Sequence, residues 1–428
     1  MKFDVRSDRG LIRAAGGSRR YVLISCAAPL IPPKPDRIPV NVAFVLDRSG
    51  SMEGERKIEI VRKAAEKAIG MLRPEDRFSV VVYDDRIDVL IESTVASDEA
   101  KHAVRQRLRS ITARGSTDLG GGWLTGCEQA AMHLDDSVPA KCFLLTDGLA
   151  NVGITRPGEL THHAGELRQR GVRTSTFGVG SDFDEVLLQR IADAGGGHSY
   201  YIEDAVQIPD FLTSELGETL EIVARDAALR FMVPAGVEAR LLNRFRFEHS
   251  GESLRIELGD MVSGEEVSIV VELRFPVGNN GDILAAGVSM CDRDRVFDTV
   301  PVSLSWTFAD HEANDRQPRD RAVDVAVAEL YAANARDEAL ELNRRGHFSS
   351  AGAVMQRTAE RIHKYAGDSR DLQNLANALL REAREYEERM TSSEMKSRYY
   401  AVQHTMRNRD AEGKSKGHRS SDHGAEES

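Results

Sequence analysis

Five side chains with oxygen ligands are spaced along this chain in a pattern that could bind a metal ion. Three of them alternate directly after an apolar run at residues 42–46, and another follows a second apolar run at residues 142–146. Carboxylate and hydroxyl oxygens are hard ligands, which suit Mg²⁺, Mn²⁺ or Ca²⁺ better than zinc or copper. The candidate metal ligands are Asp47, Ser49, Ser51, Thr117 and Asp147.

The elements that would position these ligands alternate between strand and helix. Short apolar runs rich in β-branched and aromatic residues predict buried strands, and apolar residues at helical spacing predict helices between them. Expected strands cover residues 42–46, 78–83, 142–146, 173–178 and 198–202, and expected helices cover 58–72, 100–111, 119–134, 157–170 and 184–194. This order predicts an α/β fold with a doubly wound, mostly parallel sheet that helices cover on both faces. In such sheets ligands bind outside the carboxyl ends of the strands, where Asp47 and Asp147 fall.

Together these residues resemble the metal-ion-dependent adhesion site (MIDAS) of von Willebrand factor type A (VWA) domains. The matching residues are Asp47-x-Ser49-x-Ser51, Thr117, and Asp147 before Gly148. The resemblance covers about residues 40–225, includes all five ligand positions in order, and is to the soluble bacterial type of these proteins. It implies a bound divalent ion, Mg²⁺ or else Mn²⁺ or Ca²⁺, whose sixth ligand is an Asp or Glu of a protein partner. It also implies that ligand exchange can couple to movement of the last helix, near residues 211–224.

Three neighbours of the proposed ligands have a structural interpretation beside the functional one. Asp118 is expected to cap the following helix rather than to bind the ion. Arg48 could guard the site or pair with a partner, but we expect a solvated surface arginine, the usual place for this residue type. The glycines at residues 120–122 are costly at a helix start, and either close backbone packing or the approach of a partner would explain them.

The segments on either side of the α/β region predict a second domain made of strands. Residues 21–26 and strand-like segments at 229–233, 253–258, 267–275 and 300–306 suggest an antiparallel β-sandwich formed by residues 1–39 and 226–308. Isolated strands are unstable, so the N-terminal strands should pair into this sandwich, and the VWA domain would then be inserted within it. Five of the 13 prolines fall at residues 29–39 as a stiff connector. The sequence Asn279-Asn280-Gly281 suggests a hairpin within the sandwich.

The C-terminal part of the chain changes to helical patterns. Residues 309–406 are expected to form a helical domain, with helices at about 349–365 and from about 371. From Arg407 to the end at residue 428 the composition is polar and of low complexity, which predicts a disordered tail.

Composition limits the remaining possibilities. The 428 residues are enough for two or three domains, and the net charge of −11 argues against a nucleic-acid surface, which needs a clustered basic face. No apolar run approaches the roughly 20 residues that span a bilayer, and the first residues lack the apolar core of a secretion signal. The cysteines are scattered through the chain, which together with these features predicts a protein of the reducing cytoplasm. They are Cys26, Cys127, Cys142 and Cys291.

Three functions fit these features to different degrees. The first is a scaffold or adaptor that binds an acidic residue of a partner protein through the divalent ion. The second is the VWA component of an AAA+ remodelling machine of the MoxR or magnesium-chelatase type, with the ATPase on a separate chain because no Walker motif is present. The third, a metal-dependent hydrolase, needs a dedicated general base beside the metal, and the sequence offers none beyond the ligands. We therefore expect a protein that is not an enzyme.

Overall fold

The computed structural model describes residues 2–31, 38–135, 138–297, 299–410 and 412–417. Contacts between Cα atoms divide the chain into two compact units. The α/β unit consists of Pro33–Glu221 together with Ser392–Tyr400. The β-sandwich unit consists of Met1–Pro32, Ile222–Thr391 and Ala401–Ser428. Each unit is described by itself below.

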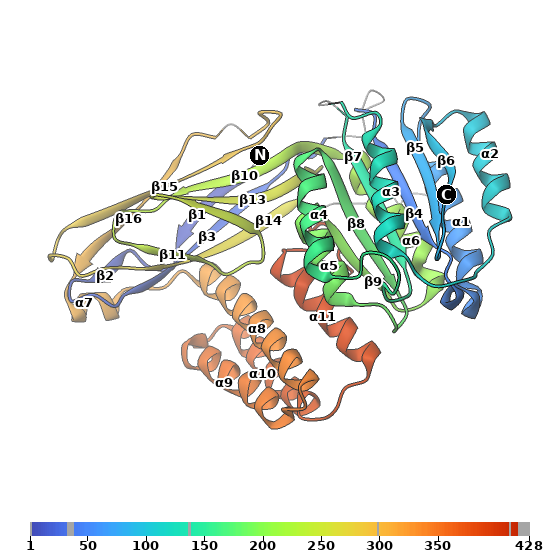
Figure 1. Ribbon diagram of the computed structural model, residues 1–428. Coiled ribbons are helices and arrows are strands. Elements are labelled where there is room, and N and C mark those ends of the chain that lie inside the picture. Colours follow the sequence, from blue (N-terminus) through green and yellow to red (C-terminus); the bar gives the residue numbers. More distant parts are fainter. Residues whose placement is uncertain (1, 32–37, 136–137, 298, 411, 418–428) are drawn as a thin grey trace, which may run out of the picture. The chain divides into compact units, whose positions relative to one another are not determined.

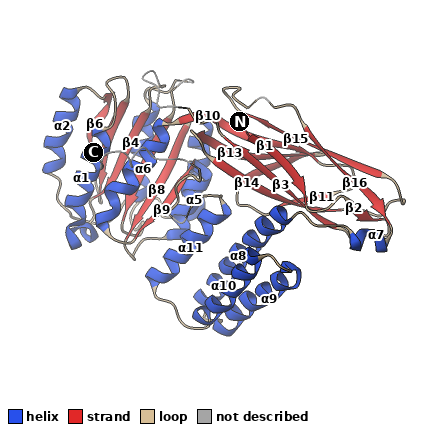
Figure 2. Cartoon of the chain, turned by 180° about the vertical axis from the view of Figure 1, so that it is seen from behind, coloured by secondary structure: helices blue, strands red, loops and turns tan. Residues whose placement is uncertain are grey.

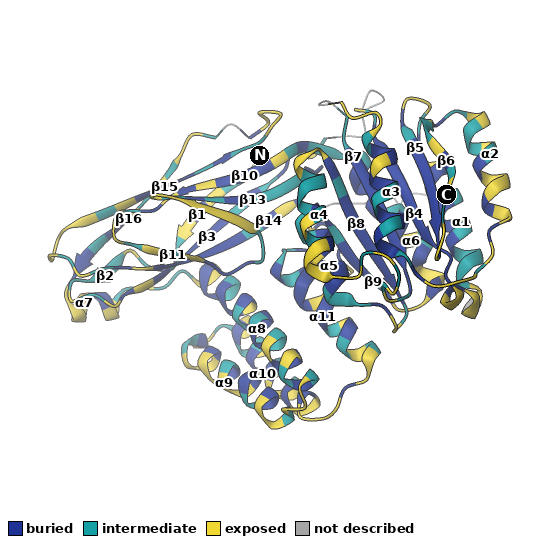
Figure 3. Ribbon diagram, in the orientation of Figure 1, coloured by how far each residue is buried: buried dark blue, intermediate teal, exposed yellow. Residues whose placement is uncertain are grey.

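The α/β unit is built on a six-stranded sheet of the predicted doubly wound type (Figure 1). The strand order is β6-β5-β4-β7-β8-β9, and every neighbouring pair is parallel except β5 with β6. The strands are β4 (Asn41–Asp47), β5 (Arg77–Tyr83), β6 (Ile87–Val95), β7 (Ala140–Thr146), β8 (Val172–Val179) and β9 (Gly196–Ile202). The central strands β4 and β7 are buried along their whole length, which confirms the reading of their apolar runs (Figure 3). The edge strand β6, which is largely exposed or half-buried, was not expected from the sequence.

Helices cover both faces of this sheet, as the alternating pattern predicts. The helices α1, α2 and α6 pack on one face around a core that includes Phe44, Val80 and Leu212, and α3, α4 and α5 lie on the other (Figures 1 and 2). The helices are α1 (Lys57–Gly70), α2 (Asp98–Arg109), α3 (Leu119–Ala131), α4 (Pro157–Gln169), α5 (Glu185–Gly195) and α6 (Ile208–Leu220), with short 3₁₀ helices η1 (Gly50–Arg56) and η2 (Ala205–Gln207). The predicted fold class is therefore confirmed for this unit.

The glycines of α3 let this helix approach the sheet closely. A Cβ on Gly122 would lie 2.4 Å from Cγ of Tyr83, and one on Gly126 would lie 2.1 Å from Cγ2 of Val45. A Cβ on Gly120 would lie 3.0 Å from the carbonyl oxygen of Ile154. Of the two explanations left open for the glycine run, the structure supports close backbone packing.

The β-sandwich unit contains two sheets that share one core, and they combine N-terminal residues with residues that follow the α/β segment. One sheet has the order β1-β3-β14-β11 and the other β12-β13-β10-β15-β16-β2. The N-terminal strands find their partners here as expected: β3 lies antiparallel to β14, and β2 lies parallel to β16. The strands are β1 (Lys2–Ser7), β2 (Leu11–Arg13), β3 (Arg19–Ala27), β10 (Ile222–Met232), β11 (Glu238–Leu241), β12 (Arg246–Ser250), β13 (Ser253–Val262), β14 (Glu266–Arg274), β15 (Ile283–Cys291) and β16 (Val302–Ala309). The first strand after the α/β segment, β10, begins at Ile222, four residues before the expected boundary.

The hairpin predicted at Asn279-Asn280-Gly281 is wrong. These residues connect β14 to β15, which belong to different sheets. Strand β14 already has β3 on one edge and β11 on the other, so no edge is free for β15. The turn chemistry was recognised, but the apolar faces of the strands decided which sheet each joins.

The C-terminal helices are α7 (His311–Arg316), α8 (Arg321–Arg344), α9 (Phe348–Ala366), α10 (Arg370–Tyr386) and α11 (Ser392–Met406). Helix α8 packs on the sandwich through a small cluster that includes Leu23, Val270 and Val327. Among the described residues, no helix combines the length and apolar character needed to cross a membrane.

Two features of this C-terminal region differ from the sequence-based expectation. The segment Ser392–Tyr400 belongs to the α/β unit, where Lys396 Nζ donates to the carbonyl oxygen of Phe183 at 2.6 Å and the Tyr400 hydroxyl lies 3.1 Å from Ser199 Oγ. The expected disordered tail begins with ordered residues, because the amide of Glu266 in β14 donates to the carbonyl oxygen of Lys416 at 2.8 Å. Residues 418–428 lie outside the described residues.

The close packing of α3 gives the first testable prediction. Gly122→Ala should lower the free energy of unfolding by about 1–3 kcal/mol, because the added methyl group overlaps the ring of Tyr83. Urea denaturation at neutral pH measures this difference. The matched control is Gly165→Ala in α4, where a Cβ meets nothing within 4 Å, and there the free energy should stay the same or rise by up to about 1 kcal/mol. Equal stability of the two variants would contradict the packing explanation.

Candidate metal centre

The two candidate carboxylates lie at one edge of the α/β sheet because their strands are parallel neighbours. Asp47 is the last residue of β4, and Asp147 follows directly after β7. The two strands pair in register, with Leu46 opposite Leu145. Thr117 lies just before α3, whose N-terminus faces the same strand ends (Figure 1). The topology therefore brings three segments that are far apart in sequence to one place.

Hydrogen bonds connect four of the five predicted ligands. Asp47 Oδ1 accepts a hydrogen bond from the Ser49 amide at 2.7 Å, and Ser49 Oγ lies 3.1 Å from Ser51 Oγ. Ser51 Oγ then donates to Asp147 Oδ1 at 2.6 Å. Carboxylate and hydroxyl oxygens from two strand ends therefore converge within hydrogen-bonding distance of one another.

The fifth predicted ligand, Thr117, lies beside the same group. A Cβ on Gly148 would lie 3.4 Å from Thr117 Oγ1 and 3.6 Å from Ser51 Oγ, so both hydroxyls border one small space. The Thr117 backbone is held by Asn151, which accepts from the Thr117 amide at 2.8 Å through Oδ1 and donates from its own amide to the Thr117 carbonyl at 3.2 Å. Asn151 was missed in the sequence, since a lone asparagine in a loop carries no spacing signal.

Burial makes the negative charge of this centre costly. Asp47 is fully buried, and desolvation raises its pKa to about 6, although hydrogen bonds from Ser49 and Thr146 oppose the rise. Thr146 Oγ1 donates to Asp47 Oδ2 at 2.6 Å, a contact that sequence reasoning also missed. The negative charge of Asp147 raises the pKa of Asp47 further. A nearby positive charge would stabilise both ionised carboxylates.

Lys57 supplies one such positive charge. Its Nζ lies 2.8 Å from Asp147 Oδ2, and its side chain is only 15% exposed. Lys57 is the first residue of α1, which follows η1 directly, so the loop that carries the serines also brings this ammonium to the site. All the donors are oxygens and a cation already contacts one of them, so the residues fit a hard divalent ion.

Arg48 is not the solvated surface arginine that the sequence suggested. Its Nε lies 2.9 Å from Asp84 Oδ2, which also accepts from Arg114 Nε at 2.6 Å. Both Arg48 and Asp84 are buried. Burial raises the pKa of Asp84, but the hydrogen bonds from Arg114 and the Arg86 amide and the charge of Arg48 outweigh it and hold the pKa below its ordinary value.

This ion pair joins the two loops that carry metal-ligand candidates. The Arg114 amide donates to the Arg48 carbonyl at 2.8 Å, and the Gly50 amide donates to the Gly115 carbonyl at 3.1 Å. Asp118 caps α3 as expected, accepting from the Gly121 amide at 2.9 Å. These contacts fix the Ser49–Ser51 loop against the loop before α3, so the hydroxyl oxygens are held in place before any ligand arrives.

A second group of potential ligands lies elsewhere in the α/β unit. Ligand atoms of His198, Glu215 and Glu218 all lie within 4.8 Å of one another. Glu215 accepts from Ser175 Oγ at 2.6 Å and from the Tyr200 hydroxyl at 2.5 Å, and its Oε2 lies 3.0 Å from His198 Nδ1. These bonds attach α6 to β8 and β9, so this group has a structural role.

Comparison with known proteins identifies the class of the α/β unit. Residues 41–214 match the von Willebrand factor type A domain family. The chain therefore contains a VWA domain, and its parallel sheet with helices on both faces is the VWA fold. VWA domains are a family of metal-dependent protein interaction modules.

Relatives of this particular chain occur in bacteria and animals. Uncharacterized protein YfbK of Escherichia coli (strain K12) is 29% identical over 248 residues, 56% of this chain and 43% of that protein. Inter-alpha-trypsin inhibitor heavy chain H4 of Homo sapiens is 29% identical over 228 residues, 51% of this chain and 24% of that protein. The matched region is thus less than half the length of either relative. The solved structure of von Willebrand factor type A from Catenulispora acidiphila is similar over 89% of both chains, with a TM-score of 0.71 and 19% identity, which shows a shared fold.

The buried ion pair beside the site gives a second prediction. Asp84→Asn should lower the free energy of unfolding at pH 7 by about 3 kcal/mol, because the buried Arg48 loses its buried partner and keeps only the half-exposed Asp88. The pKa of Asp84 is lowered, so its stabilisation is present above its ordinary pKa of about 4 and is lost as the pH falls through the lowered value. Urea denaturation from pH 7 to pH 3 should therefore show the two proteins converging in acid.

The control is Asp88→Asn, since Asp88 also pairs with Arg48 but is half exposed. Its cost should stay below about 1 kcal/mol. If Asp84→Asn cost no more than Asp88→Asn, the Arg48–Asp84 pair would not be the contact that holds the two loops.

Proposed function

We propose that the VWA domain binds a divalent cation, Mg²⁺ in the first place, through Asp47, Ser49, Ser51, Thr117 and Asp147. The observation that carries the proposal is the convergence of these oxygens at one strand edge, with both carboxylates buried. Two carboxylates balance the charge of a divalent ion, and three hydroxyls add ligands without further charge. This donor set leaves the ion able to attract another anionic oxygen.

From this we infer a role as a scaffold or adaptor that recognises an acidic side chain of a partner protein. A bound divalent ion would supply the coordination position that a partner's Asp or Glu carboxylate occupies. The residues of the chain orient the site: Asp118 fixes the start of α3, whose N-terminus favours negative charge, and Asn151 holds the loop of Thr117. We propose binding rather than catalysis, since Lys57 and Asp84 are held in ion pairs and neither is available as a general base.

We place this function in the cytoplasm. The four cysteines are free, and three of them are buried among apolar residues, which suits a reducing compartment. An AAA+ ATPase on a separate chain remains one class of partner that the scaffold role would include.

The experiment that tests this proposal measures metal and partner binding in the same proteins. We expect Mg²⁺ or Mn²⁺ to bind once per chain by titration calorimetry, and Asp47→Ala and Thr117→Ala to weaken that binding at least about tenfold. In a pull-down from native lysate, partners should be retained by wild type with Mg²⁺ and lost with EDTA or in either variant. Circular dichroism shows whether the variants fold, and Asp88→Asn is the control that should behave as wild type.

Either of two results would overturn the proposal. Absence of metal binding to folded wild type would remove its basis. Partners retained equally with Mg²⁺, with EDTA and in both variants would show that binding does not use the metal. An ATPase among metal-dependent partners would identify the remodelling-machine form of the scaffold role.

Lys57 gives a further prediction about the same centre. Its ammonium contacts Asp147 and therefore competes with a cation for that carboxylate. Lys57→Met should tighten Mg²⁺ binding about tenfold and, in EDTA, lower the melting temperature, because Asp147 then lacks its partner. The control Lys63→Met removes an exposed charge from the same helix and should change neither quantity. Weaker metal binding in Lys57→Met would mean that Lys57 supports the ion rather than competing with it.

A further inference from the structure

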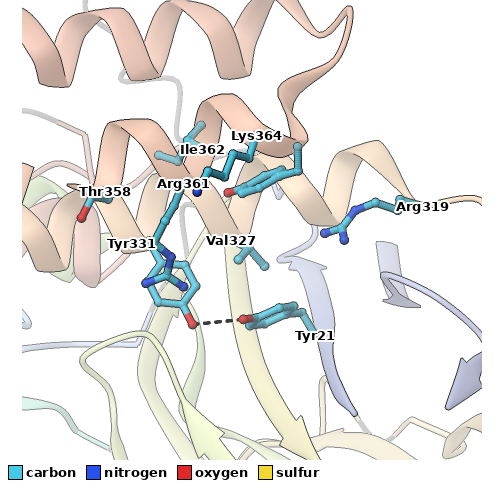
Figure 4. Close-up of a pocket in the computed structure, with 9 residues that line it drawn as sticks. Tyr21, Arg319, Val327, Tyr331, Thr358, Arg361, Ile362 and Lys364 are labelled. Carbon is cyan, nitrogen blue, oxygen red and sulfur yellow. Dashed lines mark hydrogen bonds between the residues drawn. The ribbon is translucent and has the colours of Figure 1, made fainter. Parts of the chain in front are cut away.

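The β-sandwich unit contains a pocket that the proposed metal function does not use. Its volume is about 320 Å³, within the range of small-molecule sites. It lies between strand β3 and helices α8 and α9, all within this unit (Figure 4). The lining combines three basic side chains with three tyrosines and a small apolar surface.

The basic side chains leave the pocket with uncompensated positive charge. Arg319 is neutralised by Asp324, whose Oδ2 lies 2.9 Å from Arg319 Nε. Arg361 and Lys364, both exposed on α9, have no carboxylate partner within the described part of the chain. An anion that entered the pocket could therefore pair with Arg361 and Lys364 without displacing a carboxylate.

The tyrosines are fixed in place before any ligand arrives. The Arg361 guanidinium lies 5.4 Å from the centre of the Tyr331 ring, and the Tyr331 hydroxyl lies 3.1 Å from that of Tyr21. Tyr331 also donates to Glu272 Oε2 at 3.4 Å. Figure 4 shows Arg361 stacked on the Tyr331 ring at one side of the pocket and Arg319 at the other. The hydroxyls of Tyr21 and Tyr331, together with the Tyr331 ring and the Arg361 guanidinium over it, form one wall of the pocket.

The remaining wall is apolar. Val327 lies at the pocket with 6% of its surface exposed, and the half-buried Tyr365 ring, which lies beside Arg319, adds aromatic surface. Such a surface favours the flat apolar part of a ligand. The pocket thus has positive charge on one side and apolar and aromatic surface on the other. A ligand with a negative charge and an apolar ring would fit both.

We propose that this pocket binds a small organic anion in which an oxyanion, phosphate or carboxylate, is attached to a planar aromatic ring. Arg361 and Lys364 hold the oxyanion, and the ring lies against Tyr331, Tyr365 and Val327. The site is independent of the metal centre, because every lining residue belongs to the β-sandwich unit. It gives the chain a small-molecule ligand besides a protein partner.

Titration calorimetry of the full chain in EDTA buffer tests this proposal with three probes: phenyl phosphate, benzoate and inorganic phosphate. We expect phenyl phosphate or benzoate to bind once per chain, at least about tenfold more tightly than inorganic phosphate, because only they carry a ring. The tighter of the two identifies the oxyanion. The double variant Arg361→Gln/Lys364→Gln should weaken that binding at least about tenfold.

The matched control is Arg357→Gln/Arg370→Gln, which removes the same charge from exposed positions outside the pocket and should bind as wild type. All four positions are exposed, so the variants should keep their fold, and circular dichroism checks this. The proposal is overturned if neither aromatic probe binds, if inorganic phosphate binds as tightly as they do, or if the control loses as much affinity as the pocket variant.

Discussion

The parallel pairing of β4 with β7 is the constraint on which the rest of the VWA site depends. It places Asp47 and Asp147 at one buried edge, where two negative charges close together are costly to keep ionised. A sheet with another strand order would leave each carboxylate alone at its own loop. A nearby positive charge, from Lys57 or from the cation that we propose, therefore stabilises the two carboxylates.

The surrounding residues support the two carboxylates and their neighbouring loops in two ways. Lys57 and the hydroxyl of Thr146 stabilise the carboxylates directly, through an ion pair and a hydrogen bond. The buried Arg48–Asp84 pair acts on the loops instead, holding the serines against the segment that carries Thr117. Hydroxyl ligands with little freedom lose little entropy when an ion binds. Buried ion pairs are ordinarily a weak source of stability, and here they hold the proposed metal ligands in position.

The β-sandwich unit depends on a different interaction, the burial of apolar side chains between its two sheets. Its two sheets bury a common apolar core, and its strands come from residues 2–27 and 222–309, on either side of the α/β segment, so neither set of strands forms this core by itself. Helix α8 then covers the outer face of β3 and β14. Where α8 and α9 meet β3, aromatic and basic side chains leave a pocket instead of a packed contact. The two sites that we propose therefore have opposite charge, an anionic centre for a cation in the α/β unit and a cationic pocket for an anion in this unit.

The sequence by itself determined the local elements and the ligand types. Buried strands such as β4 and β7 were predictable because five or more consecutive apolar residues are typical of a buried strand, and the Asp-x-Ser-x-Ser spacing supplied the candidate metal ligands. Only the tertiary structure decided the contacts between distant segments. Three examples are the contact of Lys57 with Asp147, the buried pair of Arg48 with Asp84, and the pairing of β14 with β3 rather than with β15. The spacing of apolar residues predicts which face of a helix or strand is buried. Which charged side chains form ion pairs, and which strands lie side by side, depends on how distant segments pack together.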